Sequence, residues 1–164
     1  QLSQATQNAG QGGNTSSLDP NQWGPQQERM VREALDRSYR QVYGTSDAEI
    51  RQRLDIQGKV ADFVGYDSQH GRWLIAESKG GDMYKATQQL ENTMNGLLNK
   101  TGFQPADVDL RIYTSANNYQ RLLTDPRGLG WYFVRDGYLG WMNEADEWVW
   151  ATINGVRVSV QVSP

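Results

Sequence analysis

The sequence predicts a domain of the α/β (α+β) class, in which helices flank a sheet and β-hairpins follow at the C-terminal end. Two segments, 25–43 and 83–100, repeat apolar residues at helical spacing, and short runs of strand-forming residues lie between and after them. The dipeptides Asp136-Gly137 and Asn154-Gly155 are typical of type I′ hairpin turns. This order of elements favours one sheet with helices packed on it.

Length and composition fit one soluble globular domain. The 164 residues are 37% hydrophobic and 21% charged, and no apolar stretch approaches the length of a membrane span. The chain has no cysteine, so any metal must be held by oxygen ligands or by the single histidine, His70. A net charge of −3 argues against a broadly basic surface that coats nucleic acid, but it does not exclude a local basic groove.

The first 23 residues predict a disordered polar linker. Gln, Asn, Ser, Thr and Gly dominate, Asp19 is the one charged residue, and such a composition buries too little apolar surface to order itself. The first residue is Gln, which indicates a piece of a longer chain, and the segment lacks the features of a signal peptide. We expect one domain over 24–164. The linker is either an ordinary interdomain connection or a tether for a delivered C-terminal domain.

The first helix is predicted to begin at Pro25 and to end at Gly44. Glu28 leads its core-facing stripe and has two explanations: it favours the helix N-terminus through the macrodipole, or it faces a site on the sheet. The stripe recurs at three- and four-residue steps: Glu28, Val31, Leu35, Tyr39 and Val42.

Three strands are predicted next, at 53–56, 60–66 and 72–78. The second and third carry apolar residues of both parities, as expected for strands that are covered on both faces. A turn over 68–71 joins these two strands into an antiparallel hairpin. The resulting register pairs Tyr66 with Trp73, Val64 with Ile75, and Asp62 with Glu77.

Asp62, Glu77 and Lys79 then share one face of a strand pair that looks buried, where each charge is costly without a partner. Two opposed carboxylates repel if both are ionised, and a divalent cation would remove the conflict. Oxygen ligands from Asp62, Glu77 and the backbone carbonyl of Ser78 suit Mg²⁺ or Mn²⁺, and Lys79 could stabilise a phosphate or orient a water nucleophile. The alternative is a surface hairpin with a cross-strand Glu–Lys pair.

The second helix is predicted over 83–100, with Asp82 as its N-cap and Gly102 at its end. A further strand follows over 107–116. The first turns of the helix lie beside the end of the preceding strand, so their polar residues could bind substrate at the same site, although surface amides on a helix usually face solvent. These candidates are Lys85, Gln88 and Gln89.

Helix, three strands, helix and strand is thus the predicted order over residues 25–115. This span resembles the PD-(D/E)xK nuclease superfamily, the restriction-endonuclease-like fold, whose αβββαβ core carries an Asp on the second strand and Glu-x-Lys on the third. Asp62 matches the Asp, and Glu77-Ser78-Lys79 matches the Glu-x-Lys motif. Ala61 stands in place of the Pro that many members also lack.

The resemblance implies a central mixed sheet and a nuclease that depends on Mg²⁺ or Mn²⁺. Asp62, Glu77 and Lys79 would be its catalytic residues, and the first two would hold the metal together with the Ser78 carbonyl. Glu28 matches the acid that many members place on the first helix, and is a further candidate ligand. Gln88 or Gln89 resembles the polar residue that some members carry on the helix after Glu-x-Lys.

The C-terminal extension, residues 116–164, is predicted to form two hairpins that extend or cover the sheet. Its many aromatic residues either pack in the core or stack on bases or sugars. They are Trp131, Tyr132, Tyr138, Trp141, Trp148 and Trp150.

The nuclease resemblance implies metal-dependent hydrolysis of phosphodiester bonds in nucleic acid with relaxed sequence preference; DNA is preferred over RNA as the expected substrate, and the sequence itself does not distinguish the two. A small nuclease-like core on a tether also resembles the C-terminal toxin domains of bacterial polymorphic toxins. That resemblance implies an antibacterial effector that is delivered into the cytoplasm of a target cell and held in check by a cognate immunity protein. No membrane partner is expected.

Other functions stay open from the sequence. A repair, recombination or phage nuclease would carry the same motif. A glycoside hydrolase could use Asp62 and Glu77 as its carboxylate pair, and a non-catalytic interaction domain could keep the fold without the chemistry. A histidine-dependent nuclease is nearly excluded because His70 is the only histidine and falls in a predicted turn.

Overall fold

The computed structural model describes residues 20–38, 41–44 and 46–164. The linker predicted over 1–23 lies outside the described residues up to position 19. In the described part of the chain, four helices and a nine-stranded mixed sheet form an α+β fold, the class that the sequence predicts.

Helices and strands alternate through the first two thirds of the chain, and strands dominate the last third. The helices are α2 (Pro20–Ser38), α3 (Asp47–Leu54), α4 (Met83–Thr101) and α5 (Ala116–Thr124). The strands are β1 (Gln41–Gly44), β2 (Phe63–Asp67), β3 (Arg72–Ser78), β4 (Val108–Thr114), β5 (Phe133–Arg135), β6 (Tyr138–Met142), β7 (Trp148–Trp150), β8 (Thr152–Ile153) and β9 (Val156–Val162).

The main path of the sheet runs in the order β1-β2-β3-β4-β9-β6-β5. β1, β2 and β3 form an antiparallel meander, β4 lies parallel to β3, and β9 lies parallel to β4. The C-terminal hairpins therefore continue the sheet through β9, and β7 and β8 pair with β6 and β9 as side branches.

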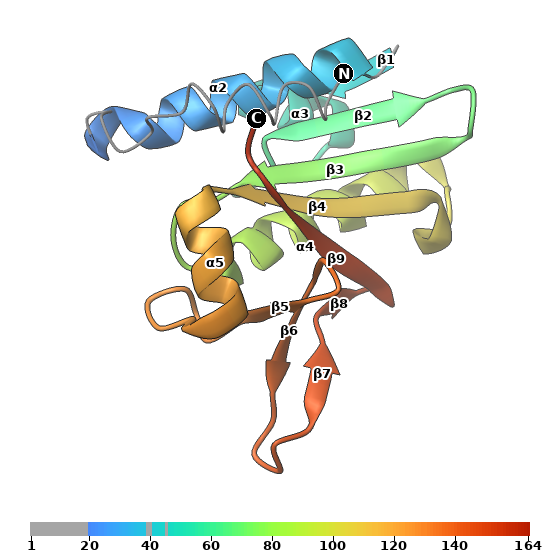
Figure 1. The fold of residues 1–164 in the computed structure, drawn as a ribbon. Coiled ribbons are helices and arrows are strands. Elements are labelled where there is room, and N and C mark those ends of the chain that lie inside the picture. The colour runs from blue at the N-terminus through green and yellow to red at the C-terminus, as the bar shows by residue number, and fades with distance from the viewer. Residues whose placement is uncertain (1–19, 39–40, 45) are drawn as a thin grey trace.

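Helices cover both faces of the central strands (Figure 1). On one face, Val31 and Leu35 of α2 pack in a small core with Phe63 and Leu74 of the β2–β3 hairpin. On the other face, alternate residues such as Ile75 join the larger core beneath α4. The β2–β3 hairpin is therefore buried on both faces, which explains why its apolar residues do not alternate with polar ones.

Two of the three residue pairs that the sequence predicts for the hairpin are confirmed in the ladder. Tyr66 lies opposite Trp73, Val64 lies opposite Ile75, and residues 68–71 form the turn between β2 and β3. The strand predicted from residue 60 begins at Phe63, so Asp62 precedes the ladder instead of lying within it.

Two predictions near the N-terminus are wrong. The first helix begins at Pro20, runs through Pro25 and ends at Ser38, so residues 20–23 do not belong to a linker. Residues 41–44, predicted as the end of that helix, form the edge strand β1 and pair with β2. Backbone pairing of residues 41–44 with β2 overrides the helical spacing that links Val42 to the preceding stripe, because the conformation of so short a segment depends on its neighbours in the sheet.

The segment 53–56, predicted as the first strand, instead contains the end of α3. Ser46 caps this helix by accepting a hydrogen bond from the backbone N–H of Glu49 at 3.2 Å. Ile50 and Leu54 lie one turn apart and are both buried. Helix α3 packs closely on β1, because a Cβ atom at Gly44 would lie 2.7 Å from Cγ1 of Ile50.

The other elements follow the sequence closely, except for α5, which the sequence analysis missed. Helix α4 has Asp82 as N-cap and Gly102 as C-cap, as predicted. Asp136-Gly137 and Asn154-Gly155 have positive φ at all four residues, as type I′ turns require. None of the described helices is long and apolar enough to span a membrane.

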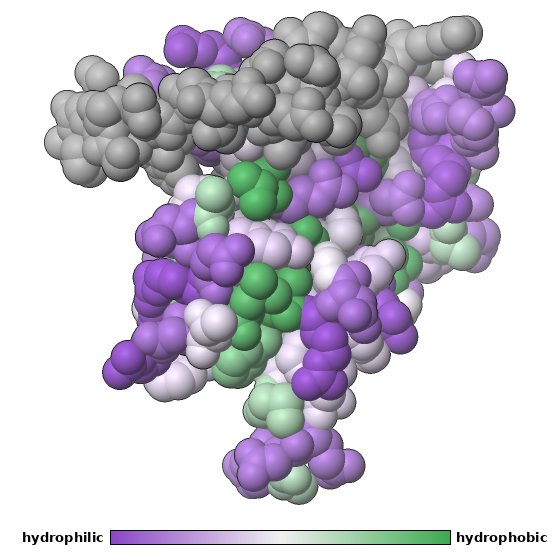
Figure 2. All heavy atoms as spheres, in the orientation of Figure 1, coloured by the Kyte–Doolittle hydropathy of each residue, from purple (hydrophilic) through white to green (hydrophobic). Residues whose placement is uncertain are grey.

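The surface is largely hydrophilic on the face drawn in Figure 2, with apolar residues gathered near its middle. Large hydrophobic side chains that remain exposed are concentrated in the C-terminal third of the described chain. They include Trp131, Tyr138, Trp141 and Met142.

Candidate active site

Asp62 and Glu77 lie together at the end of the β2–β3 hairpin, and both are buried, with 6% and 2% of their surfaces exposed. The backbone N–H of Asp62 donates a hydrogen bond to Oε1 of Glu77 at 3.1 Å. The backbone N–H of Ser78 donates to Oδ2 of Asp62 at 2.8 Å. The two carboxyl groups therefore lock the two strands together just beyond the last pair of the ladder.

Helix α4 holds the segment before Asp62 in place. The hydroxyl of Thr93 accepts a hydrogen bond from the backbone N–H of Ala61 at 2.8 Å. The side chain of Gln89 donates to the carbonyl of Val60 at 3.3 Å. The position of Asp62 thus depends on two contacts to α4 that no local pattern in the hairpin sequence encodes.

Lys79 reaches the same site from the end of β3. Its Nζ lies 3.9 Å from Oε2 of Glu77 and donates a hydrogen bond to Oε1 of Gln89 at 3.2 Å. Gln89 therefore contacts both the segment before Asp62, at Val60, and the ammonium group of Lys79. Of the two glutamines proposed from the sequence, Gln89 is the one in direct contact with the Glu77–Lys79 pair.

Two further acids meet Asp62 from the other side. They are Glu28 of α2 and Asp47 of α3. One carboxylate oxygen from each of Glu28, Asp47 and Asp62 lies within 4.8 Å of the other two. We call these three residues the acidic cluster. Glu28 is the helix acid expected from the sequence, whereas Asp47 was missed because α3 was not recognised. The Ser46-x-x-Glu49 capping pattern was the available signal.

Arg32 of α2 supplies the positive charge in the acidic cluster. Its Nη2 atom lies 2.7 Å from Oε1 of Glu28, 3.2 Å from Oδ1 of Asp47 and 3.5 Å from Oδ1 of Asp62. One nitrogen thus contacts all three carboxylates. Glu77 has no such arginine among its described contacts, and the basic group that lies near it is the Lys79 ammonium.

Burial governs the protonation of these acids. Burial, followed by the charge of Asp62 and a hydrogen bond with its carboxyl group, raises the pKa of Glu77 to about 10. Burial and a hydrogen bond with Asp62 raise the pKa of Glu28 to about 7, although Arg32 opposes the shift. At neutral pH the metal-free site therefore keeps a proton on Glu77.

The donor set fits a hard divalent cation. Four carboxyl groups converge on one end of the sheet, and oxygen-only ligands are those that Mg²⁺ and Mn²⁺ prefer. Carboxyl groups must lose their protons to bind a cation. The charge of the cation then offsets the burial and the neighbouring carboxyl groups that raise their pKa values. The acids offer two possible sets of ligands: Asp62 with Glu77, as expected from the sequence, or the acidic cluster, in which Arg32 already contacts all three carboxylates.

The remaining residues proposed from the sequence line a neighbouring cavity of about 420 Å³. Lys59, Lys79 and Lys85 surround it together with Gln88 and Gln89, and no acid lines it among the described residues. We call it the lysine cavity. Lys59 was not anticipated from the sequence; its loop is fixed because Asn92 of α4 donates hydrogen bonds to the carbonyls of Gln57 and Lys59, each at 2.9 Å.

Comparison with known proteins gives no relative: no protein-family model, no curated protein and no solved structure matches this chain. The site must therefore be interpreted from its own geometry.

Replacing Arg32 with Met tests how the acidic cluster binds a cation. We expect a lower melting temperature for the metal-free variant, because three neighbouring carboxylates lose their counter-charge. We also expect Mg²⁺ to raise the melting temperature of the variant more than that of the parent, because a ligand selective for the native state then replaces the missing charge. Thermal melts with and without Mg²⁺ measure both effects.

Arg29→Met is the matched control, since Arg29 is an exposed arginine on the same helix. It should leave the response to Mg²⁺ unchanged. A smaller Mg²⁺ effect in Arg32→Met than in the parent would show that Arg32 supports the cation site instead of competing for it.

Proposed function

We propose that this protein is a metal-dependent nuclease that hydrolyses phosphodiester bonds, with DNA as the expected substrate. The observation that carries the proposal is the burial of two neighbouring acids: the backbone N–H of Asp62 donates to the Glu77 carboxyl group, and the Lys79 ammonium lies 3.9 Å from Glu77. This arrangement is costly for stability alone, because three ionisable groups lose water at one point. Costly burial of this kind is typical of a functional site.

Asp62, Glu77 and the Ser78 carbonyl would hold the metal, with Glu28 and Asp47 as further ligands. When bound, Mg²⁺ or Mn²⁺ polarises the phosphoryl group and neutralises developing negative charge.

The side chains of the protein itself have separable roles in this proposal. Lys79, held by Gln89, places an ammonium group where it can orient a water nucleophile or stabilise a non-bridging phosphate oxygen. Lys59 and Lys85 lie in the same cavity and would neutralise neighbouring phosphates. Asp62 and Glu77 are buried, so bulk water would not screen the attraction between their carboxylates and a bound cation.

Cleavage of supercoiled plasmid DNA tests the proposal directly. We expect Mg²⁺-dependent nicking and degradation without discrete bands, because the sequence offers no recognition helix or basic arm to read bases. EDTA should abolish the activity. Full activity in EDTA would exclude the proposed chemistry, and the same set of fixed fragments from several plasmids would contradict the relaxed preference.

A glycoside hydrolase fits the geometry less well. Paired carboxyl groups in retaining enzymes stand about 5–5.5 Å apart, and those in inverting enzymes stand farther apart, so that a sugar or water fits between them. Asp62 and Glu77 are instead both buried, and their carboxyl groups accept hydrogen bonds from the backbone N–H groups of Ser78 and Asp62. Both carboxyl groups are thus engaged by the hairpin backbone, and Lys79 would have no role in glycoside hydrolysis.

We extend the proposal to the biological role expected from the sequence, an antibacterial effector delivered into a target cell and neutralised by an immunity protein. Its support is the resemblance in architecture described above. Expression of this chain in bacteria should arrest growth, and co-expression of the adjacent open reading frame should restore it. A repair, recombination or phage nuclease would show neither effect.

A further inference from the structure

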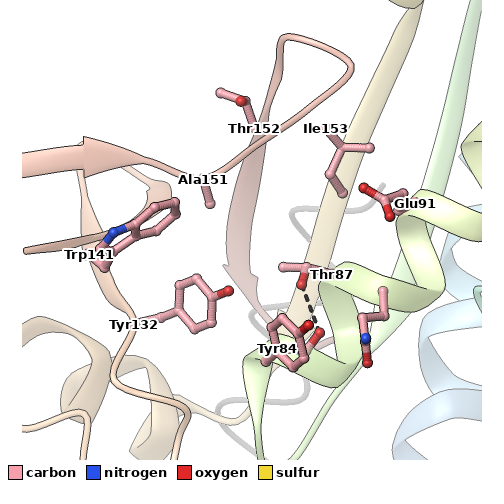
Figure 3. Close-up of a pocket in the computed structure, with 9 residues that line it drawn as sticks. Tyr84, Thr87, Glu91, Tyr132, Trp141, Ala151, Thr152 and Ile153 are labelled. Atoms are coloured by element: carbon pink, nitrogen blue, oxygen red, sulfur yellow. Dashed lines mark hydrogen bonds between the residues drawn. The ribbon is translucent and has the colours of Figure 1, made fainter. Parts of the chain in front are cut away.

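A second cleft lies on the outer side of α4, between this helix and the C-terminal strands (Figure 3). Its volume is about 220 Å³. Tyr84, Thr87 and Glu91 line it from α4, and Tyr132 and Trp141 line it from the opposite side. We call it the aromatic cleft.

The walls of the aromatic cleft are fixed to each other. The backbone N–H of Met83 donates to the carbonyl of Leu129 at 3.2 Å, which ties the start of α4 to the loop before Tyr132. Farther along the helix, the side chain of Asn154 donates to Oδ1 of Asn95 at 2.9 Å. These contacts hold the cleft open before any ligand arrives, so little ordering is needed on binding.

The chemistry of the aromatic cleft suits a base and not a phosphate. Among the described residues that line it there is no lysine or arginine, and Glu91 would repel a phosphate. Tyr84 and Trp141 remain 53% and 38% exposed, so both rings are accessible for stacking. The lysine cavity has the opposite character, three lysines and no described acid.

The two sites adjoin, because Gln88 lines both of them. Tyr84 and Lys85 are consecutive on α4, and side chains of consecutive helical residues diverge by about 100°. One faces the aromatic cleft and the next faces the lysine cavity. A strand with its phosphates in the lysine cavity would therefore present a neighbouring base to the aromatic cleft.

We propose that the aromatic cleft binds one unpaired base of the substrate strand while the lysine cavity holds the adjacent phosphates. This inference rests on the proposed function. The cleft is smaller than the pockets of roughly 300 Å³ or more that take drug-sized ligands, so it suits one ring system and not a base pair. A base enters such a cleft only after it leaves the stack, which favours single-stranded or locally opened nucleic acid.

Binding measured without cleavage tests the inference. Fluorescence polarisation in EDTA, at fixed ionic strength, compares a short single-stranded oligonucleotide with a blunt duplex of the same sequence. The parent should bind the single strand more tightly. Trp141→Ala and Tyr84→Ala should each weaken single-strand binding by roughly tenfold, because one stacking contact is lost, and should leave duplex binding nearly unchanged.

Met142→Ala is the matched control, because Met142 is the next residue on β6, is 39% exposed and does not line the cleft. It should change neither affinity. Tyr84→Ala lies on an exposed helix surface and should fold even if Trp141→Ala does not. Equal affinity of the parent for both oligonucleotides, or folded Tyr84→Ala protein with parental single-strand binding, would overturn the inference.

The outcome is separable from that of the proposed function. A parent that binds single strands through the cleft but cleaves nothing with Mg²⁺ would sink the nuclease proposal and leave the base site standing. A parent that cleaves DNA, together with cleft variants that bind single strands as the parent does, would support the nuclease proposal and overturn the base site.

Discussion

Replacing Glu77 with Gln is expected to slow Mg²⁺-dependent cleavage by about two orders of magnitude or more, without unfolding the protein. Glu77 is the most deeply buried acid of the site, and its side chain contacts both the backbone of Asp62 and the Lys79 ammonium. Gln keeps the shape and the accepting oxygen but lacks the charge that a cation needs. Initial rates of plasmid cleavage for parent and variant measure the effect, with circular dichroism as the control for folding.

The stability of Glu77→Gln should depend on pH differently from that of the parent. In the folded metal-free protein the pKa of Glu77 is about 10, against 4.5 for the ordinary side chain. The folded state therefore keeps a proton that the unfolded state loses, so parental stability falls as pH rises above about 4.5. Gln cannot ionise, and this part of the pH dependence should disappear.

Denaturant unfolding in EDTA at several pH values checks this. The free energy of unfolding of the variant, relative to that of the parent, should increase steadily as pH rises through neutrality. Asp62→Asn should also lose cleavage, since it removes a ligand charge, but it additionally weakens the contact with Arg32. Folded Glu77→Gln protein with parental cleavage would show that the buried carboxyl pair has only a structural role.

The part of the site that could be predicted from the sequence is the part encoded by one hairpin. The four-residue turn over 68–71 fixes the register of β2 against β3, and the register brings Asp62 to Glu77. Asp47 and Arg32 could not be found in this way. Their contacts depend on how α2 and α3 pack around the end of the sheet, and the N-terminal elements are where the sequence pattern was misinterpreted.

The misinterpreted N-terminal elements share a physical cause. Residues 41–44 and 47–54 are short, and short elements take their conformation from their neighbours more than from their own periodicity. The aromatic cleft was beyond sequence analysis for a related reason. Tyr84 and Trp141 lie on elements far apart in the chain, and they meet only because β9 inserts next to β4 and carries the C-terminal strands towards α4.

Replacing Lys79 with Met is expected to reduce kcat by about two orders of magnitude or more while Mg²⁺ binding persists. Met keeps the apolar stem of the side chain and removes the ammonium group, which is no metal ligand. The hydrogen bond to Gln89 and the contact with Glu77 are both lost, but Asp62 keeps its contacts with the backbone of Ser78 and with Arg32. Isothermal titration with Mg²⁺ and steady-state kinetics on the same preparation separate binding from chemistry.

Lys85→Met provides the comparison that assigns the effect, because Lys85 lines the same cavity but is exposed and has no described contact with Glu77. A lysine that only attracts phosphate should change KM and its dependence on salt, with kcat near the parental value. A lysine that acts on the reacting phosphoryl group should lower kcat at saturating substrate. If Lys79→Met behaves like Lys85→Met, with kcat intact, Lys79 is a substrate-binding residue, and the catalytic role assigned to the Glu77–Lys79 pair is wrong.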